Sequence, residues 1–402
     1  MRLIADLHIH SRYSRATSPE MDLPGLAYWA KRKGIDLLGT GDFTHPEWLA
    51  NLKRHLRPAG NGFHEYRGVD FLLTAEIAAV WREDGRGRRV HLLAFAPSIE
   101  AASRINHELG GLGRLDRDGR PMINRSVIDV VEAIWGAAPD AVVIPAHAWT
   151  PWYSVFGSKS GFDSLEACFG PYVSRIPAIE TGLSSDPAMN WRVSALDGVA
   201  LISCSDAHSP HRLGREVTLF DLKEPGYGAL VGALRVPSDR RCFGTVEVYP
   251  QEGKYHYDGH RKCNVVLSPA EAEGLENLCP VCGKPLTKGV LHRVEELADR
   301  EGGQCLGGVA GCCHLVPLEE IIAQAVGIGP NSRHVAREYD ALVGRYGNEF
   351  RVLLSITREA LARATSPRIL EAIMQVRAGN VRTEPGYDGV YGRVSIPLAT
   401  GD

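Results

Sequence analysis

From Met1 to about Leu222, short apolar runs alternate with polar loops and amphipathic stretches. The amphipathic stretches include LPGLAYWAKRKG and NRSVIDVVEAIWGAA, in which apolar residues recur at helical spacing. This alternation is typical of βα units around a parallel sheet or barrel, and seven apolar runs favour a small barrel over a flat sheet. The seven predicted strands cover residues 3–6, 36–39, 71–75, 90–95, 141–145, 178–180 and 199–203.

The character of the chain changes at Arg235. A strand-like run at 218–222 and the helix-like YGALVGALR precede the change, and a stretch rich in Cys, His, Gly and Tyr follows it to about Pro285. From Val290 onward the pattern is helical again, in LHRVEELADR, LEEIIAQAV, SRHVAREYDALVGRYG and PRILEAIMQVRAG, before a strand-like VRTEPGYDGVYGRVSIP. We therefore predict an α/β chain in three parts, with a barrel at 1–235, a small module at 236–290 and a mainly helical region with a terminal strand at 291–402.

The composition is that of an ordinary globular protein. Hydrophobic residues make up 44% and charged residues 23% of the 402 residues, and the formal net charge is −3. Such a chain is long enough for two or three domains, and its near-neutral charge gives no whole-protein case for binding nucleic acid. The longest apolar runs are far shorter than the roughly 20 residues that cross a bilayer, so we expect neither a membrane span nor a secretory signal.

The cysteine content indicates reduced thiols. Nine cysteines are an odd number for a disulfide framework, and a chain of this size does not need one. We therefore expect a cytoplasmic protein in which some thiols bind metal. Cys168, Cys204 and Cys242 are predicted to be buried as small hydrophobic residues.

Histidine and acidic residues lie in or next to almost every predicted strand. His8 and His10 alternate at the end of the first strand, so their side chains point to the same side. In a parallel barrel the carboxyl ends of the strands meet at one face, where enzymes of this architecture build their sites. The other residues of this pattern are Asp42, Glu76, His91, His147, Glu180, Asp206 and His208.

A set of His and carboxylate residues without Cys predicts a hydrolytic site with several metal ions. Such ligands suit Zn, Mn or Fe, and they accept Mg with a different affinity. A shared carboxylate such as Glu76 can bridge two ions. Asp206 or His208 could position a water or transfer protons. Glu76, Asp206 and His208 are therefore the predicted catalytic residues.

A second set of ligand-type residues lies in GHRKCNVVLSPAEAEGLENLCPVCGKP. Cys279 and Cys282 form a CxxC pair followed by a glycine, and His260 and Cys263 form an equally spaced pair upstream. Four such ligands suit one tetrahedral structural zinc, with a CxxC of free thiols as the alternative. His256 is the main competitor of His260 as the fourth ligand.

The zinc motif predicts that the 236–290 module is a zinc ribbon. Downstream, CLGGVAGCCH at 305–314 holds further Cys and His residues, but its glycine-rich spacing fits no ribbon and favours a flexible loop. Basic and aromatic residues follow one another closely in the module, which suits a nucleic-acid backbone and exposed bases, with a solvated surface as the alternative. These residues are Lys254, Tyr255, Tyr257, His260, Arg261 and Lys262.

The motifs in the first part of the chain carry a resemblance. DLHIHS, TGDFTH, the Glu of LLTAEI and SDAH resemble motifs of the polymerase and histidinol phosphatase (PHP) superfamily. This resemblance implies a distorted seven-stranded barrel that carries two or three metal ions and hydrolyses phosphoesters. It implies one ion on His8, His10, Glu76 and Asp206 and a second on Glu76, His91 and His147.

The resemblance is weaker at the third metal position. Members with three ions usually offer a His several residues after the first pair and another directly after the Asp of the TGD segment. This chain has Arg15, Ala16 and Phe43 near these positions. Asp42, His45 and His208 are the residues that could rebuild a third site.

Longer segments resemble one branch of the superfamily, the endonuclease Q family of DNA repair nucleases. The similarity covers nearly the whole chain and includes KGIDLLGTGDFTHPEWL, SDAHSPHRLGREVT and CPVCGKPLTKGVLHRVEELADR. It implies hydrolysis of the DNA phosphodiester on the 5′ side of a deaminated base, such as hypoxanthine, uracil or xanthine, or of an abasic site. His260, where members often have Cys, and the 305–314 stretch depart from the family pattern.

Selection of a damaged base requires that the base be inspected, so we predict that the lesion is flipped into a pocket. The loop at 149–172 follows His147 and carries residues suited to stacking on bases and holding phosphate, with a hydrophobic lid as the alternative. Arg175 and Arg212 are predicted phosphate clamps, with surface ion pairs as the alternative. The loop residues are Trp152, Tyr153, Phe156, Lys159 and Phe162.

Two other functions compete with a repair nuclease. A small-molecule phosphatase of histidinol-phosphate type would explain the barrel but would leave the residues after Arg235 without a purpose. A non-catalytic DNA-binding accessory protein is disfavoured because an inactive barrel should have lost several ligands. We expect damaged DNA as the partner, and the helical segments from Val290 to Gly379 are predicted to complete the DNA cleft or to dock a sliding clamp or helicase.

Overall fold

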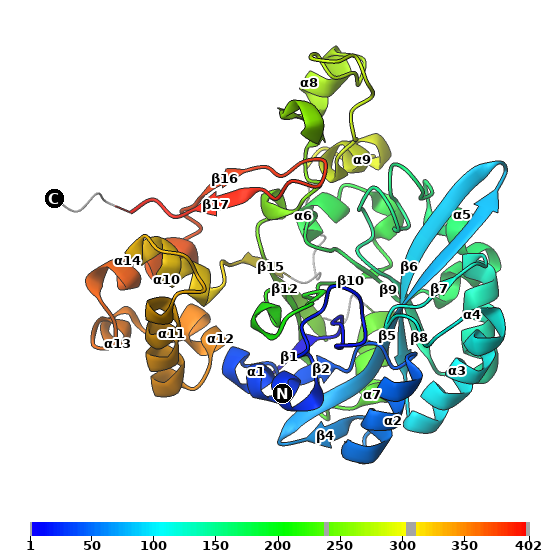
Figure 1. Ribbon diagram of the computed structural model, residues 1–402, viewed down its shortest axis with the longest axis horizontal. Helices are drawn as coiled ribbons and strands as arrows, with labels where there is room; N and C mark the ends of the chain where they lie inside the picture. Colours follow the sequence, from blue (N-terminus) through cyan, green and yellow to red (C-terminus); the bar gives the residue numbers. More distant parts are fainter. Residues whose placement is uncertain (1, 237–240, 303–310, 399–402) are drawn as a thin grey trace.

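A mixed β-sheet forms the centre of the fold (Figure 1). The computed structural model describes residues 2–236, 241–302 and 311–398 of the chain. The strands are β1 (Arg2–Asp6), β2 (Leu37–Gly39), β3 (Arg57–Pro58), β4 (His64–Tyr66), β5 (Val69–Glu83), β6 (Arg86–Ala96), β7 (Met122–Ile123), β8 (Val142–Pro145), β9 (Ala178–Glu180), β10 (Ala200–Ile202), β11 (Val217–Asp221), β12 (Cys242–Glu247) and β15 (Gly311–His314). The main sheet runs β15-β12-β11-β1-β2-β5-β4-β3, with β6 between β5 and β8 and with β7 on β5, while β9 and β10 form a separate parallel pair.

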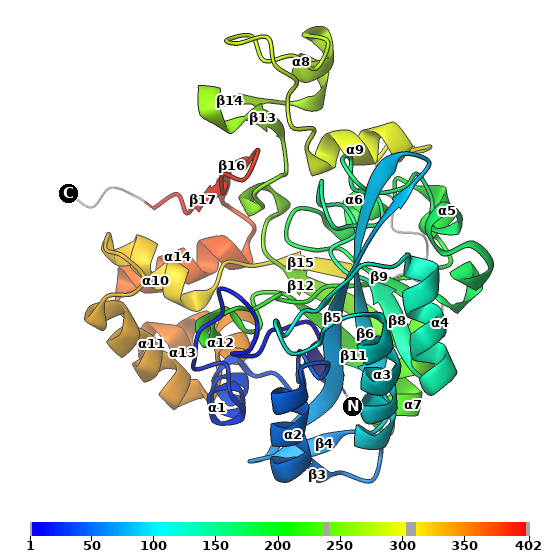
Figure 2. The same cartoon turned by 45° about the vertical axis from the view of Figure 1, so that its right-hand side comes forward.

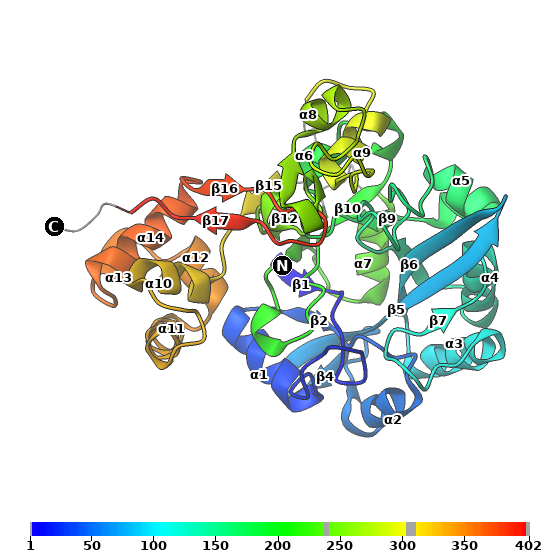
Figure 3. The same ribbon diagram turned by 45° about the horizontal axis from the view of Figure 1, so that its top comes forward.

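All seven predicted strands occur, but the prediction of a parallel arrangement is wrong in part. The β1–β2 and β2–β5 pairs are parallel, whereas β1–β11, β5–β6 and β6–β8 are antiparallel. The predicted strands at 71–75 and 90–95 are only the inner parts of β5 and β6, which form one long hairpin (Figure 3). Asp84 and Gly85 both have positive φ at its tip, as an Asp-Gly hairpin turn requires.

Helices cover the outside of the sheet, and α3 and α4 lie side by side over the β5, β6 and β8 region (Figures 1 and 2). Local signals set their ends. The Asp22 side chain accepts from Gly25 N at the start of α1, and Ser126 forms a capping box with Asp129 at the start of α4. These helices are α1 (Leu23–Lys33), α2 (Pro46–His55), α3 (Ile99–Leu112), α4 (Val127–Ala137), α5 (Leu165–Phe169), α6 (Pro187–Asn190) and α7 (Tyr227–Arg235).

A small module projects from the barrel after β12 (Figure 2). It contains the antiparallel pair β13 (Asp258–His260) and β14 (Val265–Leu267), followed by α8 (Pro269–Gly274). Helix α9 (Val290–Leu297) then returns the chain to the barrel, where Arg293 donates to the carbonyls of Phe156 and Phe162. The strand β12 precedes the module and pairs with β11 in the main sheet.

The last part of the chain is a group of helices beside α1. They are α10 (Leu318–Val326), α11 (Arg333–Tyr346), α12 (Glu349–Leu354), α13 (Arg358–Ala362) and α14 (Pro367–Arg377), followed by the hairpin of β16 (Arg382–Glu384) and β17 (Arg393–Ser395). A buried ion pair between Lys33 Nζ and Glu349 Oε2, at 2.6 Å, joins this group to α1. Tyr339 OH also donates to Glu349 Oε2, at 2.8 Å, so the buried carboxylate is satisfied.

Several other expectations can be compared with the fold. Cys168, Cys204 and Cys242 are buried, as predicted. Residues 311–314 form β15, so the predicted flexible loop is wrong there, because parallel pairing with β12 satisfies this backbone; residues 305–310 lie outside the described residues. Within the described part of the chain, no helix has the length and apolar character needed to cross a membrane.

Candidate metal centre

The end of β1 lies beside the segment that follows β10. His10 N donates to Ala207 O at 3.0 Å, and Asp206 N donates to His8 O at 2.9 Å. This pairing places Asp206 Oδ1 3.6 Å from His8 Nε2 and 3.1 Å from His10 Nε2. Glu76 reaches the same point from the middle of β5. His8, His10, Glu76 and Asp206 each offer one atom within 4.8 Å of the others, and we call them the first group.

Glu76 also belongs to a second group, with His91 and His147. In the antiparallel register His91 lies opposite Ala78, which makes Glu76 its diagonal neighbour on the same face. Glu76 Oε1 lies 2.5 Å from His91 Nδ1 and 3.1 Å from His147 Nε2, while Glu76 Oε2 lies 3.1 Å from His10 Nε2. The two oxygens of one carboxylate therefore face two different groups.

Buried atoms without a partner show what the first group lacks. Among the described residues, His8 Nε2, His10 Nε2 and Asp206 Oδ1 are buried and make no hydrogen bond. Each such atom costs about 1–3 kcal/mol if nothing satisfies it, so three that converge on one point need a common partner. A divalent cation can accept all three ligand atoms at once. The residues present therefore fit metal ions.

In three of the histidines, a neighbouring residue contacts Nδ1, the ring nitrogen that does not face the first group or Glu76. His8 Nδ1 lies 3.0 Å from both oxygens of Glu180, and His10 Nδ1 lies 3.1 Å from Asp42 Oδ1. Thr150 Oγ1 lies 3.2 Å from His147 Nδ1. Carboxylates and hydroxyls in this position orient a metal-ligating imidazole and set its tautomer. The sequence pattern does not distinguish Asp42 and Glu180 from ligands, and it does not identify Thr150.

Asp42 does not join either group, although it is a predicted ligand. Its oxygens accept hydrogen bonds from Ser11 N at 2.6 Å, Ser11 Oγ at 2.7 Å and Ser14 Oγ at 2.9 Å, in addition to facing His10. His45 instead stacks on Tyr13. The structure therefore brings Asp42, His45 and His208 into no common group among the described residues, because the first two are engaged elsewhere.

His208 lies at the edge of the first group. Its ring centroid is 4.4 Å from that of His10, and its Nδ1 is 2.9 Å from Asp206 O. Burial lowers the pKa of His208, so its imidazole is neutral near pH 7. The predicted catalytic residue is thus placed beside the ligand cluster.

Arg120 is a functional candidate that the sequence pattern missed. Its Nη1 lies 3.1 Å from Glu76 Oε2. Burial opposes ionisation of Glu76, but His91, Arg120 and His8 together hold the pKa of this carboxyl well below its ordinary value. Burial lowers the pKa of His91 to about 4. Glu76 is therefore a carboxylate and His91 a neutral imidazole at physiological pH, which are the forms that bind metal.

Three site residues sit at sharp turns in the left-handed backbone region. Asp42 (φ 50°), His147 (φ 28°) and Asp206 (φ 46°) all have positive φ. Such conformations cost of order 1–3 kcal/mol and cluster at functional sites. Gly182 (φ 70°) lies against the strained His147 turn, and a Cβ at position 182 would lie only 2.7 Å from His147 Cβ. A glycine is needed to let the β9 loop pass the His147 turn.

Loss of the Glu180 carboxylate should weaken the site without removing a ligand. We expect Glu180→Gln to lower metal affinity and activity by about 10- to 100-fold, because His8 loses the charge that orients it. Metal titration of the purified variant measures this effect. Glu166→Gln, on the exposed face of α5, is the matched control. Unchanged metal affinity in Glu180→Gln would exclude a positioning role.

The chain is similar to known proteins over nearly its whole length, not only at the site. Residues 317–380 match the family model described as the MJ0043 C-terminal domain. The chain is 28% identical to the uncharacterized protein YqxK of Bacillus subtilis, over 98% of this chain and 99% of that protein. The crystal structure of the lesion-specific endonuclease PfuEndoQ from Pyrococcus furiosus superposes with a TM-score of 0.87 at 33% identity, covering 99% of this chain and 96% of the other.

The chain belongs to the endonuclease Q family. A second endonuclease Q structure, a complex with a 27-mer duplex substrate that has an abasic lesion at the active site, superposes with a TM-score of 0.88 at 33% identity over 99% of this chain and 97% of the other. The family resemblance seen in the sequence is thereby confirmed, including the α/β fold of PHP type and the helical C-terminal region.

In this member of the endonuclease Q family, both groups border a cavity of about 1590 Å³. Its walls come from all three parts of the chain. The barrel contributes His91 and His208, the segment before the Cys-rich module contributes Tyr255, and the C-terminal region contributes Gln324 and Arg393. A site enclosed by distant segments is suited to a large ligand.

The predicted DNA-binding residues divide into two sets. Trp152, Tyr153 and Arg212 line the cavity, and Trp152 packs edge-on against Tyr255 at 5.7 Å. Phe156 is buried against Trp149, so it cannot stack on a base. The structure places the remaining three away from the cavity lining: Lys159 is exposed, Arg175 packs over Trp135, and Phe162 stacks on Trp81.

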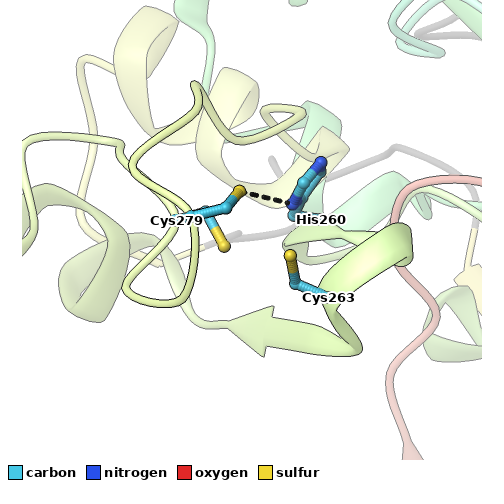
Figure 4. Close-up of side chains that lie close together, drawn as sticks. His260, Cys263 and Cys279 are labelled. Carbon is cyan, nitrogen blue, oxygen red and sulfur yellow. Dashed lines mark hydrogen bonds between the residues drawn. The ribbon is translucent and has the colours of Figure 1, made fainter.

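The four predicted zinc ligands of this endonuclease Q relative converge in the small module. His260, Cys263, Cys279 and Cys282 place one ligand atom each within 4.8 Å of the others, and Figure 4 shows three of these side chains pointing toward one another. Burial alone would raise the pKa of the Cys279 thiol. Hydrogen bonds from the backbone N–H groups of Val281 and Cys282 outweigh this effect and contribute to lowering the pKa to about 6. His256 instead faces Ser184 O at 3.1 Å, away from this cluster.

Proposed function

We propose that this protein is a metal-dependent DNA repair endonuclease that hydrolyses a phosphodiester bond beside a lesion. The observation that carries the proposal is the match to lesion-specific endonuclease Q structures over 99% of the chain. The two ligand groups at the cavity supply a site for the chemistry. The family resemblance implies deaminated bases and abasic sites as lesions, with cleavage on the 5′ side.

We assign the first ion to His8, His10, Glu76 and Asp206 and the second to Glu76, His91 and His147. When bound, two divalent ions would provide Lewis acidity toward the phosphate and a nucleophile from water at neutral pH. Zn, Mn, Fe and Mg all remain compatible with this set of ligands. In the small module, His260, Cys263, Cys279 and Cys282 would hold one structural zinc.

Other side chains at the site have roles that do not require them to bind metal. His208 is neutral near pH 7 and half-buried at the cavity wall, so it can accept a proton or position a water. The Arg120 guanidinium, beside Glu76, can offset the negative charge of a phosphate. Glu180 and Asp42 hold the imidazoles of His8 and His10 in place.

The cavity is the proposed pocket for a flipped lesion. A deaminated or missing base pairs badly, so extruding that nucleotide costs less than extruding a normal one. Trp152 and Tyr153 provide aromatic surface from the barrel, and Tyr255, which packs edge-on against Trp152, extends that surface. Residues of α10 and of the β16–β17 hairpin also line the cavity, so we propose that the C-terminal region completes the DNA cleft.

Trp152 should contribute to selection of the lesion. Stacking of a base on an aromatic side chain is worth about 1–3 kcal/mol, so Trp152→Ala should reduce the preference for damaged over undamaged duplex by about 10-fold. Metal content should stay unchanged. Tyr28→Ala, an exposed aromatic position on α1, is the control. Equal selectivity of Trp152→Ala and wild type would remove this residue from lesion recognition.

The proposed activity is tested with 5′-labelled duplex oligonucleotides that contain hypoxanthine, uracil, an abasic site or no lesion. Purified protein is incubated with Mn or Mg, with Asp206→Ala in parallel. We expect a cut immediately 5′ of the lesion that is missing from the undamaged duplex and from the variant. No cleavage of any lesion despite full metal occupancy would overturn the proposal, and turnover of a phosphomonoester would then identify a phosphatase.

A further inference from the structure

A third cluster of ligand-type residues lies outside the barrel centre and the Cys-rich module. Glu247 at the end of β12 and Cys312 and His314 in β15 each place one atom within 4.8 Å of the others. The parallel register pairs Thr245 with Cys312 and Glu247 with His314. Because side chains alternate along a strand, these four project from the same face of the two strands.

The cluster contains a carboxylate that lacks a counter-ion. Glu247 is fully buried, and its Oε2 has no hydrogen-bond partner among the described residues. Its other oxygen receives a long contact, 3.4 Å, from Thr181 Oγ1, and the Thr245 side chain also interacts with this carboxyl group. Glu216, a second buried carboxyl group, lies close enough to interact with it electrostatically. Among the described residues, neither Glu247 nor Glu216 forms a direct ion pair. Arg215 interacts electrostatically with Glu216, but no positively charged side chain in this part of the structure is in ion-pair contact with Glu247.

The histidine of the cluster is held in a fixed orientation. His314 stacks on Tyr249, with ring centroids 5.2 Å apart. Its Nε2 lies 3.2 Å from Asp186 Oδ2 and 3.8 Å from Cys312 Sγ. A thiol, an imidazole and a carboxylate around one point are a ligand set for a borderline-soft divalent ion. Asp186 Oδ2 contacts the same His314 nitrogen that faces Cys312.

We propose that Glu247, Cys312 and His314 form a further metal site, the interstrand site, which binds Zn²⁺ and holds β15 against β12. Bound zinc would supply the missing positive charge and satisfy Glu247 Oε2. The chain passes from β15 through the buried Leu315 and Val316 directly into α10, which lines the cavity. The interstrand site would thereby fix the point at which the C-terminal helices attach to the barrel.

The zinc content of full-length protein tests the interstrand site independently of activity. We expect Cys312→Ser and Glu247→Gln each to bind one zinc equivalent less than wild type by plasma mass spectrometry. Cys313→Ser is the matched control, because Cys313 is exposed and points to the opposite side of the same strand. Cobalt-loaded Cys312→Ser should also lose part of the thiolate absorption, whereas Cys313→Ser should keep all of it. Equal zinc content in the four proteins would overturn the proposal.

A measurement on the unmodified protein covers the case in which these variants do not fold. Crystals of the wild-type protein are examined by anomalous scattering above and below the zinc edge. We expect a peak between Glu247, Cys312 and His314 in addition to the one in the Cys-rich module. A peak in the module with none between β12 and β15 would contradict the interstrand site. Because neither experiment measures cleavage, its outcome is independent of the proposed nuclease activity.

Discussion

Glu76→Gln is expected to reduce cleavage by about 10³-fold, which corresponds to several kcal/mol of lost transition-state stabilisation. The reason is its position: Oε1 faces His91 and His147, and Oε2 faces His10. An amide keeps the shape of the side chain but removes the charge and offers only one oxygen. Both ligand groups should therefore lose affinity together, and metal analysis should show less than wild-type occupancy at both.

The control for this substitution is Glu132→Gln. Glu132 lies on α4, where it accepts a hydrogen bond from Tyr172 OH, so its replacement should leave metal content and cleavage unchanged. Circular dichroism should show that both variants are folded. A Glu76→Gln protein that keeps its metal ions and its rate of cleavage would show that this carboxylate does not bridge the two groups.

Most ligands of the two groups could be predicted from the sequence, because local chain geometry positions several of them. His8 and His10 are two residues apart in extended chain, so they must share a side. His147 and Asp206 follow buried strands that the apolar pattern locates well. Each of these inferences depends on only a few neighbouring residues.

Strand direction could not be obtained in the same way. Glu76 and His91 meet because β5 and β6 form an antiparallel hairpin, and the charged residues of its outer part hide the length of both strands from the apolar pattern. The prediction of parallel βα units therefore missed the pairing, although the Asp84-Gly85 turn carried a signal for it.

The sequence also could not predict which acidic residues are metal ligands and which support a ligating histidine. Asp42 and Glu180 are acidic residues after predicted strands, just as Asp206 is. Only the distances show that Asp42 and Glu180 face Nδ1 of His10 and His8, respectively. Asp206 instead faces Nε2 of both histidines. In the 149–172 loop, only the burial of each side chain shows which aromatic residues are available to bind DNA. Trp152 lines the cavity, whereas Phe156 is buried in the core.

Cys279→Ser is expected to unfold the small module while the barrel stays folded. The hydrophobic cluster of this module contains only Ala272, Cys279 and Leu286 as buried residues, so it has little apolar burial to stabilise it without metal. Structural zinc in such modules contributes about 10 kcal/mol or more to folding. Limited proteolysis should cut the variant between β13 and α9, and a chelator should make the wild type equally sensitive.

The effect of Cys279→Ser on catalysis should differ from that of Glu76→Gln. The module lies away from both ligand groups but follows Tyr255, which lines the cavity. Its unfolding should therefore weaken DNA binding and raise KM, whereas barrel metal content should persist. Cys313→Ser, which removes an exposed thiol outside the module, should match wild type in both protease resistance and KM. A protease-resistant Cys279→Ser protein would show that the module folds without its zinc.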